Sequence, residues 1–212
     1  MRHVRPRAAA RDRASPPEER SLTDPKYIGS FPRADALLDP PFPEVAFLGR
    51  SNVGKSSLLN ALVGHRIAKT SSTPGKTRAM NVFLVRGALY FLDLPGYGYA
   101  RISKAQRAAF RGLLKHTLRR DRLAGVVWLL DIRHSPSVDD RAMQDVLVER
   151  GTHVLAALTK SDKLSRAERR SREGELRDEL GLPEDQIVVT SAVSGEGIVE
   201  LREAIMELIQ AR

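Results

Sequence analysis

The stretch at residues 49–56, which reads G-R-S-N-V-G-K-S, constrains the fold of this chain more than any other. It follows the apolar run 45–48, which is typical of a buried strand, and residues 57–63 continue with helical spacing. Between a strand and a helix, the pattern G-x-x-x-x-G-K-S predicts a loop whose backbone N–H groups surround a phosphate. Lys55 would bring a positive charge to the outer phosphates, and Ser56 would offer its hydroxyl to Mg²⁺. The stretch therefore predicts a nucleoside triphosphate site, and the flanking elements disfavour the alternative of a chance match.

The size and composition of the chain narrow the class of protein. Its 212 residues suffice for one well-buried α/β domain but not for two of ordinary size. The absence of cysteine excludes disulfides, thiolate metal sites and a Cys nucleophile, and it agrees with a reducing cytoplasm. No apolar run approaches the roughly 18 residues that a membrane span needs. We therefore expect a cytoplasmic protein with no membrane partner.

The charge of the chain is strongly positive, with 35 basic and 26 acidic residues. Such a surplus usually marks a protein that works against a polyanion, although an arginine-rich proteome is the alternative. Residues 1–25 are rich in Arg and Pro and have almost nothing apolar to bury, so we expect a disordered basic tail before a domain at 26–212. The tail alone does not explain the charge, because 29 basic and 22 acidic residues follow it.

The order of strand and helix patterns predicts the fold. Residues 26–44 would be a lead-in whose apolar side chains, Ile28, Phe31, Leu37 and Leu38, pack on the domain. A hairpin at 82–85 and 88–92 and strands at 45–48, 126–130, 154–158 and 187–189 are separated by helices near 57–63, 103–120, 138–149, 166–180 and 198–209. The pattern predicts a three-layer α/β fold around a mostly parallel six-stranded sheet with one antiparallel edge strand.

The base of the nucleotide would be read after the strand at 154–158, at the ligand-facing end of an open α/β sheet. Residues 159–162 read T-K-S-D, and Asp162 can accept hydrogen bonds from N1–H and the 2-amino group of guanine. Against adenine, which lacks these donors, Asp162 would be unpaired. The stem of Lys160 would lie along the base. After the last strand, Ser191 and Ala192 are placed to support guanine O6 with a backbone N–H. ATP is the less favoured alternative.

A second phosphate-side motif follows the hairpin. Residues 93–96 read D-L-P-G and match D-x-x-G, in which Asp93 would orient Mg²⁺ through water and the Gly96 N–H would meet the γ-phosphate. A threonine from the polar loop before the hairpin should close on the metal, and Thr77 is favoured over Thr73 for this role.

These motifs together resemble the EngB (YihA/YsxC) family of bacterial ribosome-biogenesis GTPases, in the class of TrmE, Era and EngA, over residues 27–210. The resemblance rests on G-R-S-N-V-G-K-S-S-L-L-N, T-P-G-K-T, D-L-P-G-Y-G-Y-A, D-I-R-H-S-P and L-T-K-S-D-K-L-S, which begin in order at Gly49, Thr73, Asp93, Asp131 and Leu158. The Y-G-Y-A continuation and Thr159 in place of the usual Asn are marks of the family. The chain departs from it at Arg78, where Gln is usual, and at 194–197, which is closer to the sister GTPases.

The resemblance implies a P-loop NTPase of the Ras-like G-domain type that binds GTP and GDP with Mg²⁺ and assists assembly of the large ribosomal subunit. It also implies a role in division septation, contacts with ribosomal RNA and proteins but not DNA, and a monomer. The implied nucleotide contacts are Gly49, Arg50, Ser51, Asn52, Val53, Gly54, Lys55, Ser56, Ser57, Gly75, Lys76, Thr77, Arg78, Ala79, Asp93, Leu94, Pro95, Gly96, Thr159, Lys160, Ser161, Asp162, Thr190, Ser191 and Ala192. Lys55, Thr77, Gly96 and Asn52 would act in catalysis, and Ser56 and Thr77 would bind the metal directly.

The residue after D-x-x-G bears on the rate of hydrolysis. Many GTPases place a water-orienting glutamine there, whereas this chain has Tyr97, so we expect slow intrinsic hydrolysis. Asn52 resembles the asparagine through which related GTPases hold K⁺ beside the phosphates, and the alternative is that it only braces the loop. Asp131 and His134 are more consistent with a structural role than with an acid–base pair.

We therefore expect a molecular switch in which GTP orders the loop at Thr77 and the segment 93–100. Tyr97, Tyr99, Arg101 and the basic helix at 103–120 would form the face that contacts the ribosome, although most charges of that helix are expected simply to face solvent. An RNA-binding module with a largely structural nucleotide site and a GTPase of the transfer-RNA-modification or iron-uptake type are the alternatives.

Overall fold

The computed structural model describes residues 25–68, 79–98 and 103–210. Its strands are β1 (Lys26–Phe31), β2 (Glu44–Gly49), β3 (Met80–Val85), β4 (Leu89–Asp93), β5 (Leu123–Asp131), β6 (Val154–Thr159) and β7 (Ile187–Val189). Its α-helices are α1 (Lys55–Val63), α2 (Lys104–Thr117), α3 (Val138–Glu149), α4 (Arg166–Leu180) and α5 (Ile198–Gln210), with short 3-10 helices at Ser161–Lys163 and Glu184–Gln186. The predicted alternation of strands and helices is confirmed, and α2 ends at Thr117 rather than at residue 120. The tail at 1–24 lies outside the described residues.

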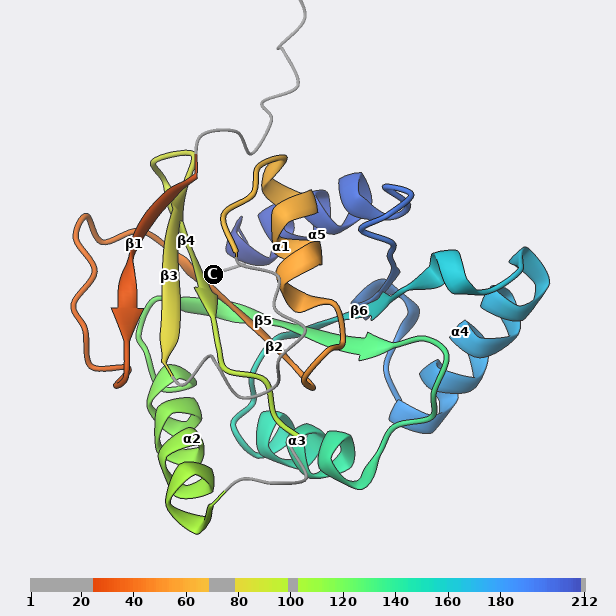
Figure 1. The fold of residues 1–212 in the computed structure, drawn as a ribbon, viewed down its shortest axis with the longest axis horizontal. Coiled ribbons are helices and arrows are strands. Elements are labelled where there is room, and N and C mark those ends of the chain that lie inside the picture. Colours follow the sequence, from red (N-terminus) through yellow and green to blue (C-terminus); the bar gives the residue numbers. More distant parts are fainter. Residues whose placement is uncertain (1–24, 69–78, 99–102, 211–212) are drawn as a thin grey trace, which may run out of the picture.

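The strands form one seven-stranded sheet in the order β1-β3-β4-β2-β5-β6-β7 (Figure 1). The pairs β4–β2–β5–β6–β7 are parallel, whereas β3 is antiparallel to both β4 and β1. The α/β class with a mostly parallel sheet is therefore confirmed. The predicted count of six strands is wrong, because residues 26–31 of the lead-in hydrogen-bond to β3. As a result β1 is the edge strand, and the antiparallel strand lies one position inside it.

The lead-in packs on the domain only in part. Phe31 and Leu38 contact the core, as predicted. Ile28 lies within a register shift of β1 and is 38% exposed, and Leu37 is 98% exposed. The prediction for these two side chains is wrong, because the irregular register of β1 and the turn after it direct them outward.

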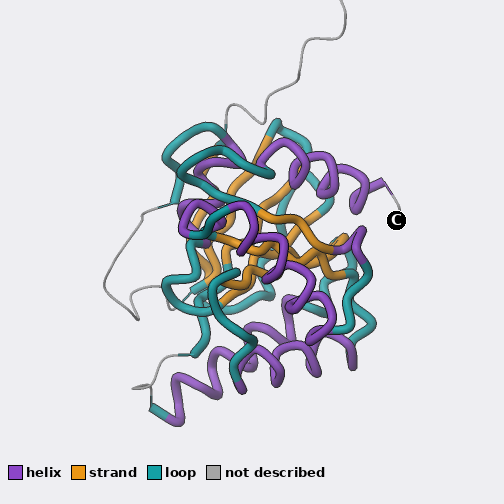
Figure 2. Tube along the Cα trace, turned by 90° about the vertical axis from the view of Figure 1, so that its right-hand side faces the viewer, coloured by secondary structure: helices purple, strands orange, loops and turns teal. Residues whose placement is uncertain are grey.

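The core consists of two apolar layers, one on each face of the sheet. Neighbouring residues of β2 alternate between them: Val45 and Phe47 pack with α1 and α5, whereas Ala46 and Leu48 pack with α2, α3 and α4. Figure 1 shows α1 and α5 together on one face and α2 and α3 on the other, and Figure 2 shows helices on both sides of the central strands. Each helix in the described part of the chain is too short or too polar to span a bilayer.

This arrangement positions the site. Because β2, β4, β5, β6 and β7 run parallel, their carboxyl ends lie along the same edge of the sheet. The phosphate loop, the D-x-x-G segment, Asp131, the T-K-S-D segment and Ser191 each follow or complete one of these strands. The fold therefore brings together motifs that are more than 100 residues apart in the chain.

Candidate functional site

The phosphate loop joins β2 to α1 without any side-chain cap. Helices α2, α3 and α4 each begin with a serine that caps the backbone, whereas α1 begins after Gly54 with no side-chain hydrogen bond to its first turn and no acidic residue there. Gly54 has φ = 107°, in the left-handed region that favours glycine. The first N–H groups of α1 are thus left for an anion, and the helix dipole favours a phosphate there.

Close backbone contacts hold the loop in place. A Cβ on Gly49 would lie 2.9 Å from Val53 Cγ1 and 3.0 Å from the Leu129 carbonyl oxygen, so only glycine fits. A Cβ on Gly96 would lie 3.0 Å from Ser51 Oγ, which shows how closely the D-x-x-G segment approaches the loop. The Ser51 N–H donates to the Tyr97 carbonyl at 3.0 Å, and the Tyr97 N–H donates to the Gly49 carbonyl at 3.2 Å. The two phosphate-side motifs therefore form one structural unit.

The charged groups of these motifs face each other. The Lys55 ammonium forms an ion pair with the Asp93 carboxylate, which also accepts a hydrogen bond from Asn81 Nδ2 at 3.2 Å. Asn81 lies on β3 and was not predicted, because nothing in the sequence indicates that its partner lies on the neighbouring strand. Both Lys55 and Asp93 therefore lie at the amino end of α1, where phosphates would bind.

The same region offers oxygen ligands suited to Mg²⁺. Ser56 lies half-buried in the first turn of α1, next in sequence to Lys55, and Asp93 supplies a nearby carboxylate. Among the described residues, no three His, Asp or Glu side chains form a dedicated metal cluster. The donor set therefore fits an ion that is bound mainly through a hydroxyl, water and substrate phosphates, as Mg²⁺ usually is.

Several members of the predicted nucleotide-binding stretches serve the core or face solvent. The side chains of Val53, Leu94 and Pro95 are buried. Arg50 and Ser57 are exposed. At most the backbone of the buried residues can contact a ligand.

The base-reading segment is attached directly to the phosphate loop. Thr159 Oγ1 donates to the Val53 carbonyl at 2.7 Å, and Lys160 Nζ donates to the Asn52 carbonyl at 2.6 Å. Lys160 has φ = 64°, a left-handed conformation that turns its side chain back toward the loop. The structure thus brings 159–162 and 49–56 together as one site, as predicted from the place of each segment at the end of a strand.

The Asp162 carboxylate is held by Ser191. The Ser191 hydroxyl donates to Asp162 Oδ1 at 2.7 Å, and Lys163 lies 3.1 Å from Oδ2. These partners, the serine first, lower the pKa of Asp162 below its ordinary value, although burial acts in the opposite direction. Asp162 is therefore kept as a carboxylate, the form that accepts two hydrogen bonds from guanine.

The loop after β7 completes this end of the site. The Ser191 N–H is bonded to the Glu196 carbonyl, so the predicted backbone support for the base can come from Ala192 but not from Ser191. The Ser161 N–H donates to the Thr190 carbonyl at 3.2 Å, and Ser161 Oγ donates to the Glu196 carboxylate. The side-chain roles of Ser191 and Glu196 were not predicted, because the residues they contact are 29 and 35 positions away.

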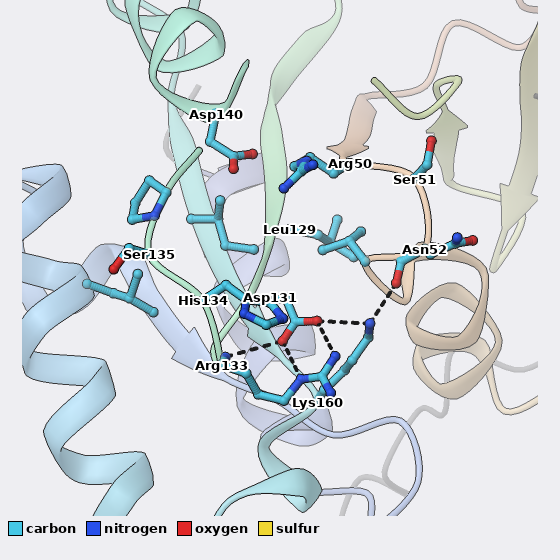
Figure 3. Close-up of a pocket in the computed structure, with 14 residues that line it drawn as sticks. Arg50, Ser51, Asn52, Leu129, Asp131, Arg133, His134, Ser135, Asp140 and Lys160 are labelled. Carbon is cyan, nitrogen blue, oxygen red and sulfur yellow. Dashed lines mark hydrogen bonds and ion pairs between the residues drawn. The ribbon is translucent and has the colours of Figure 1, made fainter. Parts of the chain in front are cut away.

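A cavity of about 260 Å³ lies beside the phosphate loop (Figure 3). The loop lines one side, and the turn after β5, with Asp131, Arg133 and His134, lines the other. Asp131 forms ion pairs with Arg133 at 2.7 Å and with Lys160 at 2.9 Å. The Asp131 carboxylate therefore pairs with these two cations, and His134 contacts Asp131 through its backbone N–H, which donates to the Asp131 carbonyl at 3.1 Å.

Tyr97 occupies the position after D-x-x-G, but its side chain points into the core. It is 6% exposed; its hydroxyl accepts a hydrogen bond from Trp128 Nε1 at 2.8 Å and donates to Asp140 Oδ1 at 2.8 Å. Burial, followed by the charge of Asp140, raises the pKa of Tyr97 far above its ordinary value. The expectation that Tyr97 belongs to an exposed partner-binding face is wrong, because these buried groups bind its hydroxyl.

Some predicted residues lie outside the described residues: Gly75, Lys76, Thr77 and Arg78 of the loop before β3, together with Tyr99 and Arg101. Ala79 is described, half-buried immediately before β3. The predictions for the loop therefore stay predictions.

Comparison with known proteins identifies relatives of the whole domain. A family model described as 50S ribosome-binding GTPase matches residues 44–160. A probable GTP-binding protein EngB from Gemmatimonas aurantiaca is 50% identical over 187 residues, which cover 87% of this chain and 92% of the relative. A protein with the same description from Syntrophomonas wolfei is 47% identical over 169 residues, 79% of this chain and 87% of its own.

Solved structures agree on the fold. The crystal structure of a probable GTP-binding protein engB is similar with a TM-score of 0.67 at 23% identity, over 80% of this chain and all of that one. The structure of Era in complex with MgGDPNP and a segment of 16S ribosomal RNA is similar with a TM-score of 0.65 at 25% identity, over 79% of this chain and 56% of Era. The similarity to Era covers the domain described here.

Proposed function

The chain belongs to the EngB family of GTP-binding proteins, which is a family of GTPases, and from this premise we propose that it is a GTP-dependent switch in the assembly of the large ribosomal subunit. One observation carries the nucleotide part of the proposal: the Lys160 ammonium of the base-reading segment is bonded to the Asn52 carbonyl of the phosphate loop. A single ligand with a purine base and phosphates would therefore contact both segments. We place this activity in the cytoplasm, where ribosomal subunits are assembled in bacteria.

Guanine is the base that the site fits. Asp162 remains ionised, and guanine presents two donors to a carboxylate in that position, whereas adenine presents none. The substitution Asp162→Asn replaces one acceptor oxygen by a donor and should exchange the preference from GTP to xanthosine triphosphate, whose 2-oxo group accepts. Affinities of the variant for the two nucleotides test this. A variant that loses both nucleotides equally would contradict guanine recognition by Asp162.

The phosphate side would be held by the chain's own backbone and by Lys55. In the structure Lys55 is bound to Asp93, so phosphates must draw the ammonium away from that carboxylate. When bound, Mg²⁺ would neutralise charge on the β- and γ-phosphates, held by Ser56 and Thr77 and, through water, by Asp93. Gly96 lies directly against the phosphate loop, so its N–H could donate a hydrogen bond to a γ-phosphate and would lack that partner with GDP.

Intrinsic hydrolysis should be slow. The side chain that follows D-x-x-G is buried against Trp128 and Asp140 and is therefore directed away from the place where an attacking water would stand. Related GTPases use a glutamine there, and its loss leaves the water without that partner. We infer that full turnover requires help from the bound partner or from a cation held at Asn52.

The basic helix α2 is the surface that we propose for the large subunit. Its exposed basic side chains repeat every three or four residues and fall within about 80° of the helix circumference. These side chains are Lys104, Arg107, Arg111 and Lys115, and we call them the α2 stripe. The helix contains no acidic residue, unlike α4, where basic and acidic residues are mixed. An unbroken positive stripe of this kind suits the phosphates of ribosomal RNA.

Co-sedimentation with purified large subunits tests the proposal. We expect binding that is strong with a non-hydrolysable GTP analogue, weak with GDP, and reduced by neutralising Arg107, Arg111 and Lys115 to Gln. A matched control neutralises Arg166 and Arg170, which are exposed on α4, and should bind as the natural chain does. Binding that is equal in all nucleotide states would instead indicate an RNA-binding module with a structural nucleotide site. The septation role that the family resemblance implies stays a prediction.

A further inference from the structure

Asp131 stands at the carboxyl end of β5, between the base-reading segment and the cavity beside the phosphate loop. Figure 3 shows its carboxylate between two cationic side chains, Arg133 and Lys160. Arg133 donates from Nε at 2.8 Å and from a terminal nitrogen at 2.7 Å, and Lys160 Nζ lies 2.9 Å from Oδ2. The Asp131 side chain is only 15% exposed. It is therefore a charged group held by charged partners at the edge of the site.

The Lys160 ammonium makes two contacts that fix its position. One is with Asp131 and the other is with the Asn52 carbonyl of the phosphate loop. A lysine side chain has about 2 kcal/mol of rotamer entropy to lose, so a single contact would leave it mobile. The carboxylate on one side and the carbonyl on the other therefore fix the position of the Lys160 ammonium.

The charge of Asp131 is maintained at neutral pH. Burial raises the pKa of Asp131, but hydrogen bonds from Arg133 and Lys160 lower it by more, so that the pKa lies well below its ordinary value. A carboxylate at this place attracts the ammonium far more strongly than a neutral amide would. Arg133 binds the carboxylate from the side away from Asn52 (Figure 3).

We propose that Asp131 is a positioning residue for guanine-nucleotide binding, which acts by holding the Lys160 side chain along the base and against the phosphate loop. The proposal rests on the nucleotide site described above. It assigns to Asp131 a part in nucleotide affinity that does not depend on which purine edge Asp162 reads. Because the Asp131 carboxylate contacts Lys160, its effect on the nucleotide would pass through the lysine side chain.

The test replaces Asp131 by Asn, which has the same shape and no charge, and measures affinity and dissociation rate of fluorescent GDP. A hydrogen bond between charged groups is worth about tenfold to a hundredfold in an equilibrium constant, and Asn keeps one acceptor, so we expect a loss of about tenfold. Most of it should appear as faster dissociation. The matched control is Arg133→Gln, which removes the other cation from the same carboxylate and should change affinity less than twofold.

A double-mutant cycle separates positioning from a general loss of structure. In a Lys160→Met background, Asp131→Asn should cost less than twofold, because the side chain that it positions is absent. An equal tenfold loss in both backgrounds, or a change in unfolding free energy without a change in GDP affinity, would overturn the proposal. Asp131→Ser serves for the same cycle should the Asn variant fail to fold.

The failure of this inference can be told apart from failure of the proposed function. In an Asp162→Asn background, Asp131→Asn should weaken binding of xanthosine diphosphate by the same factor as it weakens GDP binding in the natural chain. If Asp162→Asn does not change the base preference, guanine recognition by Asp162 is wrong. The double-mutant cycle of Asp131 and Lys160, measured with GDP, would still test the positioning role of Asp131 independently.

Discussion

Removing the Tyr97 hydroxyl should destabilise the protein without slowing intrinsic GTP hydrolysis. The hydroxyl joins three elements: it belongs to the segment after β4, accepts from Trp128 on β5 and donates to Asp140 in the first turn of α3. Asp140 keeps its other oxygen bonded to the N–H and hydroxyl of Ser137. In Tyr97→Phe the ring stays in place, and only the two hydroxyl bonds are lost.

The expected size of the effect follows from burial. The Trp128 side chain is 1% exposed, so its N–H would be left without a partner, at a cost of about 1–3 kcal/mol. The bond to the carboxylate of Asp140, which is 4% exposed, adds about 1.5 kcal/mol or more. We therefore expect the free energy of unfolding to fall by about 3 kcal/mol, a large part of the 5–15 kcal/mol typical of a domain.

The assay is urea unfolding with saturating GDP and Mg²⁺, together with single-turnover hydrolysis of GTP. Tyr27→Phe is the control, because Tyr27 is 55% exposed, and it should change the unfolding free energy by less than about 0.5 kcal/mol. The rate of GTP hydrolysis by Tyr97→Phe should stay within about twofold. A loss of stability below about 1 kcal/mol would refute the assigned bonds, and a rate that falls tenfold or more would mean that the hydroxyl acts on the reacting phosphate.

Three further changes probe other parts of the molecule. Glu44→Gln removes the buried carboxylate that pairs with the partly buried guanidinium of Arg120 and should lower the free energy of unfolding by about 3 kcal/mol, measured by thermal or urea denaturation; an unchanged midpoint would contradict a structural ion pair. Ser191→Ala removes the main cause of the lowered pKa of Asp162, so on acidification GDP binding should be lost at a higher pH than in the natural chain. If a pH titration with fluorescent GDP shows both proteins losing GDP at the same pH, the hydroxyl of Ser191 does not hold the charge of Asp162. GTP turnover should be faster in K⁺ than in Na⁺, and Asn52→Ala should abolish the difference; equal rates in the two salts would leave Asn52 as a brace of the loop.

The elements next to the site could be predicted because local patterns determine them. Strand β2 and helix α1 follow from an apolar run, a glycine loop and helical spacing, and the loop between them requires glycine at 49 and 54. The prediction missed β1, since its six residues have one irregular register and mostly exposed side chains, so that no alternation of apolar residues marks it as a strand. Pairing with β3 decides its conformation, and pairing is a long-range property.

The same distinction explains what could be predicted of the site. Lys55, Asp93 and Asp162 belong to motifs whose spacing implies their chemistry. By contrast, the burial of Tyr97 depends on Trp128 and Asp140, which lie 31 and 43 positions away. A tyrosine beside two glycines suggests an exposed aromatic residue as readily as a buried one, and only the packing of α3 against the sheet decides between them.

The backbone and the side chain of Tyr97, at the position after D-x-x-G, bind different parts of the molecule. The backbone of Tyr97 is bonded to Gly49 and Ser51 of the phosphate loop, while its hydroxyl is bonded to β5 and α3. Lys160 holds the other side of the loop through Asn52. Because the loop is fixed from both sides by the protein itself, we expect it to move little between GTP and GDP. The proposed switch would then lie in the loop at Thr77 and in the segment 93–100 rather than in the phosphate loop itself.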